Sequence, residues 1–169
     1  MCWTGKLEDK HVAQEDIRVF KVCRPCCWLG PNYAAPYFMY LNTGLLYEKG
    51  RTYYSQFDIR YHWAKDKTVE INQGIHSYAI GNSQGSESVK EYSDYFEDSF
   101  SIIESCHSYG ANSRIVLCTI PKGSVYYLNN EGCYVSECLR IDKIINSRVA
   151  YDNIREINNQ IISFKILGH

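Results

Sequence analysis

The chain has 169 residues, 45% of them hydrophobic and 22% charged, proportions that are typical of folded proteins and exclude a disordered chain. Eighteen Lys and Arg residues against nineteen Asp and Glu give a net charge of −1 without any basic run, which disfavours a binder of long nucleic acids. No apolar stretch reaches the roughly 20 residues that a membrane span needs, and the first twenty residues lack the apolar core of a secretory signal. We therefore expect one domain over residues 1–169 that works in the cytoplasm without crossing a membrane.

The first half of the chain predicts strands. Residues 16–24 are β-branched and aromatic, with apolar side chains on both faces, as in a strand covered on both sides. Residues 36–44 predict a second strand that ends at Asn-Thr-Gly. Residues 45–73 have conflicting periodicity and are interpreted as short strands and loops, and residues 74–81 predict a short strand bracketed by glycines.

A change of period after residue 81 predicts an amphipathic helix between residues 86 and 110. Ser86 or Ser88 can cap its start, Glu91 lies three residues after Ser88 as in a capping box, and Gly110 ends it. The apolar stripe of this helix consists of Val89, Tyr92, Phe96, Phe100 and Ile103.

The last third of the chain returns to strands and ends in a helix. Residues 113–120 form a continuous apolar run, and residues 124–128 and 133–141 flank a turn, as in a hairpin. The sequence as a whole predicts an α+β fold: a mixed, mainly antiparallel sheet with one long amphipathic helix packed on it and a C-terminal helix. The stripe of that C-terminal helix consists of Tyr151, Ile154, Ile157, Ile161 and Phe164.

The Lys-Gly-Ser of residues 122–124 does not form a phosphate-binding P-loop. That motif needs an upstream glycine and a helix after it, whereas here Pro121 precedes Lys122 and a strand follows. Pro at the start and Gly123 near the end predict a turn between two strands. Lys122 is then either a solvated turn lysine or a cation that reaches an anionic ligand.

His76 and Tyr78 form the most chemically capable cluster. They share one face of a strand, while Ser77 takes the other, so Ser77 and His76 are not a nucleophile and its base. The pair is suited to hydrogen bonding and stacking with a ligand. The alternative is a core histidine that is satisfied by the backbone.

The eight cysteines of the chain predict structural thiols. In a reducing compartment cysteine behaves as a small buried hydrophobe. A zinc site would need two pairs at ligand spacing, and a redox motif would need a helix after the pair. Cys23 and Cys26 have pair spacing, but Cys133 and Cys138 are spaced too loosely, and the residues after Cys27 are loop-like. We expect no metal and no cofactor.

Three stretches carry a resemblance to known proteins. The opening "MCW" with "EDIRVFKV", the central "GIHSY", and the closing "VLCTIPKGSVYY" with "EGCYVSECLRI" resemble a set of short proteins of gut Bacteroidales and their phages. The resemblance covers about half the chain and implies no established activity. It implies a bacterial host cell as the place of action.

The order of elements also resembles ADP-ribosyltransferase-like folds. In such folds a first strand, a later strand and helix, and a late strand supply a basic or polar contact, a tyrosine and a glutamate beside the ribose of NAD. The resemblance implies these roles for Arg18 or Lys21, Tyr78 or Tyr109, and Glu131 or Glu137.

Two functions follow as expectations, with a protein-interaction module as a third. The first is a non-enzymatic protein that binds a small nucleotide-type ligand, NAD-derived or cyclic, and sequesters an immune signal of the host for a phage. The second is an ADP-ribosyltransferase-like enzyme that uses NAD.

The expected ligand site follows from what a nucleotide requires. A base needs an aromatic ring, a ribose needs polar donors and a phosphate needs a cation. The expected ligand site therefore consists of His76, Tyr78, Lys122, Tyr126 and Tyr127, with only one of the two adjacent tyrosines facing the ligand. We also expect a homodimer, because a C-terminal stripe left uncovered by its own core would need a second copy to bury it.

Overall fold

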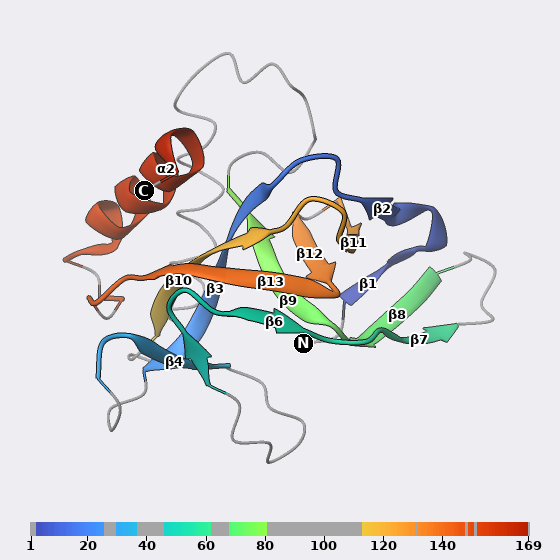
Figure 1. Ribbon diagram of the computed structural model, residues 1–169, viewed down its shortest axis with the longest axis horizontal. Helices are drawn as coiled ribbons and strands as arrows, with labels where there is room; N and C mark the ends of the chain where they lie inside the picture. Colours follow the sequence, from blue (N-terminus) through green and yellow to red (C-terminus); the bar gives the residue numbers. More distant parts are fainter. Residues whose placement is uncertain are drawn as a thin grey trace.

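Antiparallel strands dominate the structure, a computed structural model that describes residues 3–25, 30–36, 46–61, 68–80, 113–130, 132–147, 149–150 and 152–168. Figure 1 shows the strands crossing the middle of the molecule, with the C-terminal helix at one end. The elements are β1 (Trp3–Lys6), a 3-10 turn (Leu7–Asp9), β2 (Lys10–Val12), β3 (Ile17–Pro25), β4 (Tyr33–Pro36), β5 (Tyr47–Glu48), β6 (Thr52–Tyr54), β7 (Asp58–Tyr61), β8 (Thr68–Gln73), β9 (Ile75–Ala79), β10 (Arg114–Ile120), β11 (Val125–Leu128), β12 (Cys133–Ser136), β13 (Cys138–Ile144) and α2 (Ile154–Leu167).

The strands form two sheets in which every pair is antiparallel. The larger sheet has the order β2-β11-β12-β9-β3-β10-β13-β6, with β4 paired to β3 and β5 paired to β4. The smaller sheet has the order β1-β8-β7 and lies at the end of the molecule away from the helix (Figure 1).

The centre of the large sheet is the pair of β3 and β10. Their register runs from Ile17 opposite Ile120 to Cys23 opposite Arg114. Six of the seven residues of β10 are buried, which confirms the prediction that this apolar run is covered on both faces. The predicted strands at residues 16–24 and 74–81 are confirmed as β3 and β9, and the short strands expected between residues 45 and 73 are β5 to β8.

The two faces of the large sheet carry separate apolar clusters. On the first, which we call the helix face, Phe20, Val22, Ile115 and Leu117 pack beneath α2. The other, which we call the opposite face, is filled by side chains of the sheet itself. They include Val19, Cys23, Val116, Cys118, Ile120, Leu139 and Ile141, with Tyr53 from β6 and Tyr126 from β11 packed against them. Because both ends of the sheet contribute to one cluster, the sheet curls around it.

The C-terminal helix begins after Asn153 and ends at a left-handed Gly168. Its residues Ile154, Ile157, Ile161 and Phe164 are buried on the helix face, which confirms the predicted helix, while Tyr151 of the predicted stripe lies outside the described residues. The stripe is thus absorbed by its own chain, and the reason given for dimerisation through this surface no longer applies.

The predicted fold class is wrong. The described residues are mostly antiparallel β-sheet, and the helix that packs on it is the C-terminal α2; among them no long amphipathic helix packs on the sheet. The helix predicted between residues 86 and 110 and the strand predicted at 36–44 lie outside the described residues, apart from Pro36. The helix face is instead covered by α2 and by the small sheet, whose Val69 and Ile71 pack on Tyr127 and Val135.

Candidate functional site

A shallow groove of about 800 Å³ lies where β6, β13 and the turn between β10 and β11 meet. It is the surface hollow that we consider as a site, because it combines an exposed aromatic ring, charged groups and hydroxyl groups. Its lining residues are Thr52, Tyr54, Ser55, Gln56, Pro121, Lys122, Gly123, Ser124, Glu137, Cys138 and Arg140.

The predicted turn at residues 121–124 forms one wall of the groove. The N–H of Ser124 donates to the carbonyl of Pro121 at 3.1 Å, and Gly123 has a φ of 86° that favours glycine. The turn is held against the end of β2, since the N–H of Gly123 donates to the carbonyl of Ala13 (2.8 Å) and the N–H of Ala13 donates to the carbonyl of Ser124 (3.0 Å). This geometry is a tight turn between strands, as the sequence predicted.

Two carboxylates fix the charged groups of the groove. Arg140 donates from Nε to Oδ1 of Asp142 at 2.8 Å, and its Nη2 lies 3.5 Å from Oδ2 of Asp16. The other oxygen of Asp16 accepts the backbone N–H of Lys122 at 2.9 Å, and the other oxygen of Asp142 accepts the hydroxyl of Thr119 at 2.6 Å. The hydrogen bond with Asp142 raises the pKa of Arg140, so this side chain is charged at physiological pH and is paired with carboxylates.

The aromatic wall of the groove is Tyr54 on the edge strand β6. Its side chain is 79% exposed, and it lies opposite Cys138 in the register of β6 and β13. Burial raises the pKa of the Cys138 thiol, against hydrogen bonds from Ser124 and Tyr54 that lower it. Cys138 is therefore a protonated thiol at neutral pH.

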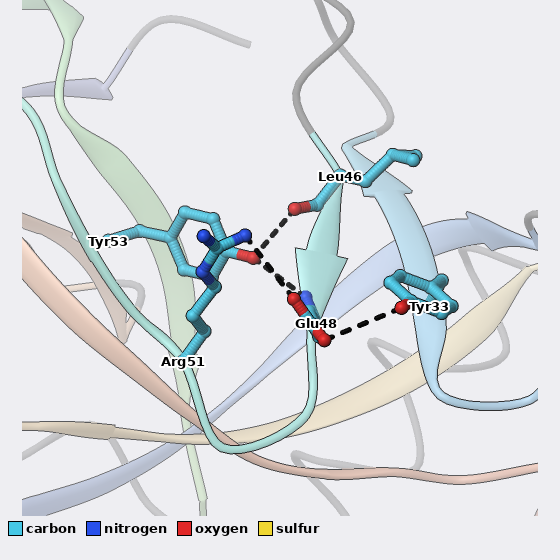
Figure 2. A network of polar contacts seen from close by, with 5 residues as sticks. All are labelled: Tyr33, Leu46, Glu48, Arg51 and Tyr53. Carbon is cyan, nitrogen blue, oxygen red and sulfur yellow. Dashed lines mark hydrogen bonds and ion pairs between the residues drawn. The ribbon is translucent and has the colours of Figure 1, made fainter.

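The position of Tyr54 depends on its neighbour Tyr53, which points to the other side of the strand. The hydroxyl of Tyr53 donates to the carbonyl of Leu46 at 2.7 Å and accepts the N–H of Glu48 at 2.8 Å (Figure 2). Glu48 in turn accepts from Arg51 at 3.3 Å and from the hydroxyl of Tyr33 at 3.4 Å (Figure 2). This network anchors β6, so that the ring of Tyr54 is presented from a fixed strand.

Of the five residues predicted from the sequence, Lys122 lines the groove. Tyr126 and Tyr127 point to opposite faces of β11, and neither lines it. The ring of Tyr126 lies 5.4 Å from Tyr134 and 5.4 Å from His11. Tyr127 is 1% exposed and meets Phe57 edge-on at 5.2 Å beneath the small sheet.

His76 and Tyr78 lie on the helix face of β9, away from the groove. Tyr78 is opposite Phe20 on β3, with ring centroids 5.5 Å apart, and packs against the cluster beneath α2. His76 is opposite Val135 on β12. Burial, and after it the positive charge of Lys21, lowers the pKa of His76 to about 3, so its imidazole is neutral at physiological pH. The structure therefore does not bring the five candidates together.

The residues that the transferase resemblance implied are also dispersed. Arg18 donates to the carbonyls of Phe164 and Lys165 at the end of α2. Lys21 is on the same strand as Arg18, but its side chain lies on the opposite face of the large sheet. Glu137 lines the groove. Tyr109 and Glu131 lie outside the described residues. The described candidates thus point to separate regions and form no common site.

The cysteines that the structure describes are free thiols. Cys23 and Cys118 are fully buried on the opposite face, and burial raises the pKa of Cys23 to about 12 and also raises the pKa of Cys118. Within the described ranges no three His, Cys, Asp or Glu side chains are grouped as metal ligands. Cys26 and Cys27 lie outside those ranges.

The sequence patterns did not identify Tyr54, Arg140 and Asp16 as site residues. Tyr54 falls in the stretch of conflicting periodicity, and its exposure follows from the inward anchoring of Tyr53. Arg140 and Asp16 are 124 positions apart and meet only through the pairing of β3, β10 and β13. One usable signal was the adjacent pair Tyr53-Tyr54, since alternation along a strand sends one of the two rings outward.

No family model, curated protein or solved structure matches this chain. None of the helices in the described part of the chain has the length and apolar character needed to cross a membrane.

Proposed function

We propose that this chain is a non-enzymatic protein that binds a small nucleotide-type ligand in the groove between β6, β13 and the β10–β11 turn. The observation that carries the proposal is the exposed ring of Tyr54 in the same groove as Lys122. A ring that stacks on a base and a cation that meets a phosphate are the two elements of nucleotide recognition. Ser55 and Gln56 add polar groups for a ribose, and the volume falls within the about 300 to 1,000 Å³ of small-molecule sites.

Binding without turnover agrees with the chemistry of the lining residues. Burial raises the pKa of the Cys138 thiol, so it is not a reactive thiolate at neutral pH. Oε1 of Glu137 accepts the N–H of Val125 at 2.8 Å, so this carboxylate holds the start of β11. None of the described lining residues is a histidine that could activate a hydroxyl or a thiol.

The biological part of the proposal depends on the resemblance to phage and Bacteroidales proteins. A protein that binds a nucleotide-type immune signal without consuming it would act by sequestration in the cytoplasm of the bacterial host. Such a protein must be made in excess of the signal, and no cofactor is required.

The test is calorimetry of the purified protein with NAD and with 3′,5′-cyclic adenosine monophosphate. We expect one of them to bind, and Tyr54→Ala to weaken that binding by about 5- to 150-fold, since stacking of a base on an aromatic ring contributes ~1–3 kcal/mol. Lys122→Ala should also weaken binding, whereas Lys143→Ala, a matched change of an exposed lysine outside the groove, should not.

Two results would contradict the proposal. Unchanged affinity in both Tyr54→Ala and Lys122→Ala would place any binding elsewhere. Release of nicotinamide from NAD would favour the transferase alternative, whereas intact NAD recovered after heat denaturation supports sequestration.

A further inference from the structure

We infer that the groove selects nucleotides that carry a single negative charge and discriminates against polyphosphates. The inference rests on the proposed function and narrows its ligand class to singly charged nucleotides, such as cyclic mononucleotides. It follows from the number of cations in the groove that are free to meet a ligand.

Arg140 is paired with two carboxylates, each of which accepts a second hydrogen bond elsewhere. Asp142 holds Arg140 at 2.8 Å while its second oxygen accepts from Thr119 at 2.6 Å. Asp16 pairs with Arg140 at 3.5 Å while its second oxygen accepts the N–H of Lys122 at 2.9 Å. Because each carboxylate is fixed by a second hydrogen bond, releasing Arg140 to a ligand would break a network rather than one contact.

Lys122 is the remaining cation among the groove residues that the structure describes. Its side chain is exposed and has no ion pair among the described residues. One negative charge on a ligand balances Lys122. A second negative charge on the ligand would lie near Glu137 and near the Asp16 and Asp142 carboxylates that pair with Arg140, and the described lining residues offer no further unpaired cation. Like charges within a few ångströms oppose binding even near the surface.

The single aromatic ring of the described groove lining also favours a small nucleotide. Tyr54 is the single aromatic side chain among the described lining residues of the groove. It offers a stacking surface for one base, which fits a mononucleotide with one ring system. A ligand with one base and one negative charge is a nucleoside phosphodiester with a single phosphate, such as a cyclic mononucleotide.

The experiment compares two probes with the same base, 3′,5′-cyclic adenosine monophosphate and adenosine triphosphate without magnesium. We expect the cyclic nucleotide to bind the wild-type protein at least about tenfold more tightly. Asp142→Asn keeps the shape of the side chain but removes one carboxylate from Arg140, so the ratio of the two affinities should fall by about threefold or more. Asp152→Asn removes the same charge from an exposed residue outside the groove and should leave the ratio unchanged.

Glu137→Gln is a second variant, because the amide oxygen can still accept from Val125. It should lower the ratio too, and thermal unfolding checks that both variants fold. Triphosphate binding as tight as that of the cyclic nucleotide would overturn the inference and leave the proposed function intact. An unchanged ratio in both folded variants would also overturn it. If neither probe binds, the inference fails, and the proposed function fails with it when NAD does not bind either.

Discussion

At the scale of single residues, the fold depends on positions where the chain has little choice of side chain. Gly74 is the residue between β8 of the small sheet and β9 of the large sheet, so the chain changes sheets there. Its φ is 128°, and a Cβ on it would lie 2.3 Å from Cγ1 of Val135 and 3.2 Å from Cδ1 of Phe57. A side chain at this position would therefore suffer both backbone strain and overlap with the core beneath the small sheet.

We predict that Gly74→Ala destabilises the protein by about 2–4 kcal/mol, from strain and overpacking together. Gly50→Ala is the matched control: Gly50 also has a positive φ, 85°, but a Cβ there meets nothing within 4 Å. It should cost only about 1 kcal/mol. Chemical denaturation of both variants measures the difference, and equal losses would show that the contact with Val135 does not matter.

At the scale of elements, α2 closes the helix face of the large sheet. Its four buried stripe residues meet Phe20 and Leu117 from the two central strands. Arg18 of β3 fixes the end of the helix, since its Nη1 donates to the carbonyls of Phe164 at 3.2 Å and Lys165 at 2.9 Å. A guanidinium at the C-terminus of a helix also interacts favourably with the helix dipole. The helix is thus bound to the sheet by packing and by a cap from the sheet itself.

Removing one buried side chain of α2 should therefore weaken the whole fold. Ile157 is fully buried, and we predict that Ile157→Ala lowers the free energy of unfolding by about 2–5 kcal/mol. Ile166 on the same helix is 51% exposed, and Ile166→Ala should change it by no more than about 0.5 kcal/mol. Urea denaturation tests this, and a small loss in Ile157→Ala would mean that the helix is not part of the cooperative core.

The elements that were predicted well from the sequence are those with a clear local pattern of apolar residues. The 3-3-4-3 spacing of the C-terminal stripe and the apolar run of β10 each depend on local pattern, and both were confirmed. Residues 133–141 were expected as one strand but form two, β12 and β13, separated by Glu137. At this break the N–H of Glu137 donates to the carbonyl of Val125 at 3.1 Å, and the carboxylate of Glu137 accepts the N–H of Val125. This contact with β11 is not visible in the local sequence pattern, so the interruption of the strand could not be predicted.

The site was less predictable because it depends on pairing between distant strands. A period of two places His76 and Tyr78 on one face but does not say that α2 and the small sheet occupy that side of the sheet. Lys122 was identified because a turn residue is exposed wherever the turn lies. Tyr54 and Arg140 become neighbours of Lys122 only after β6 and β13 pair and the β10–β11 turn folds beside them.

At the scale of the whole molecule, one curled sheet separates the apolar cluster of its opposite face from the two clusters of its helix face. The opposite face is closed by the sheet itself, and the helix face is closed by α2 at one end and by the small sheet at the other (Figure 1). His76 lies on the helix face. It is opposite Val135, which packs under the small sheet, and it precedes by two residues Tyr78, which packs under α2. A charge on this imidazole would therefore oppose the packing of the sheet with both of its covers.

The stability of the molecule should consequently fall in mild acid through His76. Its pKa is lowered to about 3 in the folded protein, by burial first and by the charge of Lys21 second, whereas an unfolded histidine has a pKa near 6.5. Below about pH 6.5 the unfolded chain binds a proton that the folded chain does not, so stability is lost as the pH falls from about 6.5 towards 3. The loss between pH 7 and pH 5 should be about 2 kcal/mol.

His76→Gln should remove this part of the pH dependence of stability, while His11→Gln, a change at an exposed histidine, should retain it. Urea denaturation at the two pH values measures it, and a His76→Gln variant that loses as much stability as the wild type would show that this histidine is not held neutral by the fold.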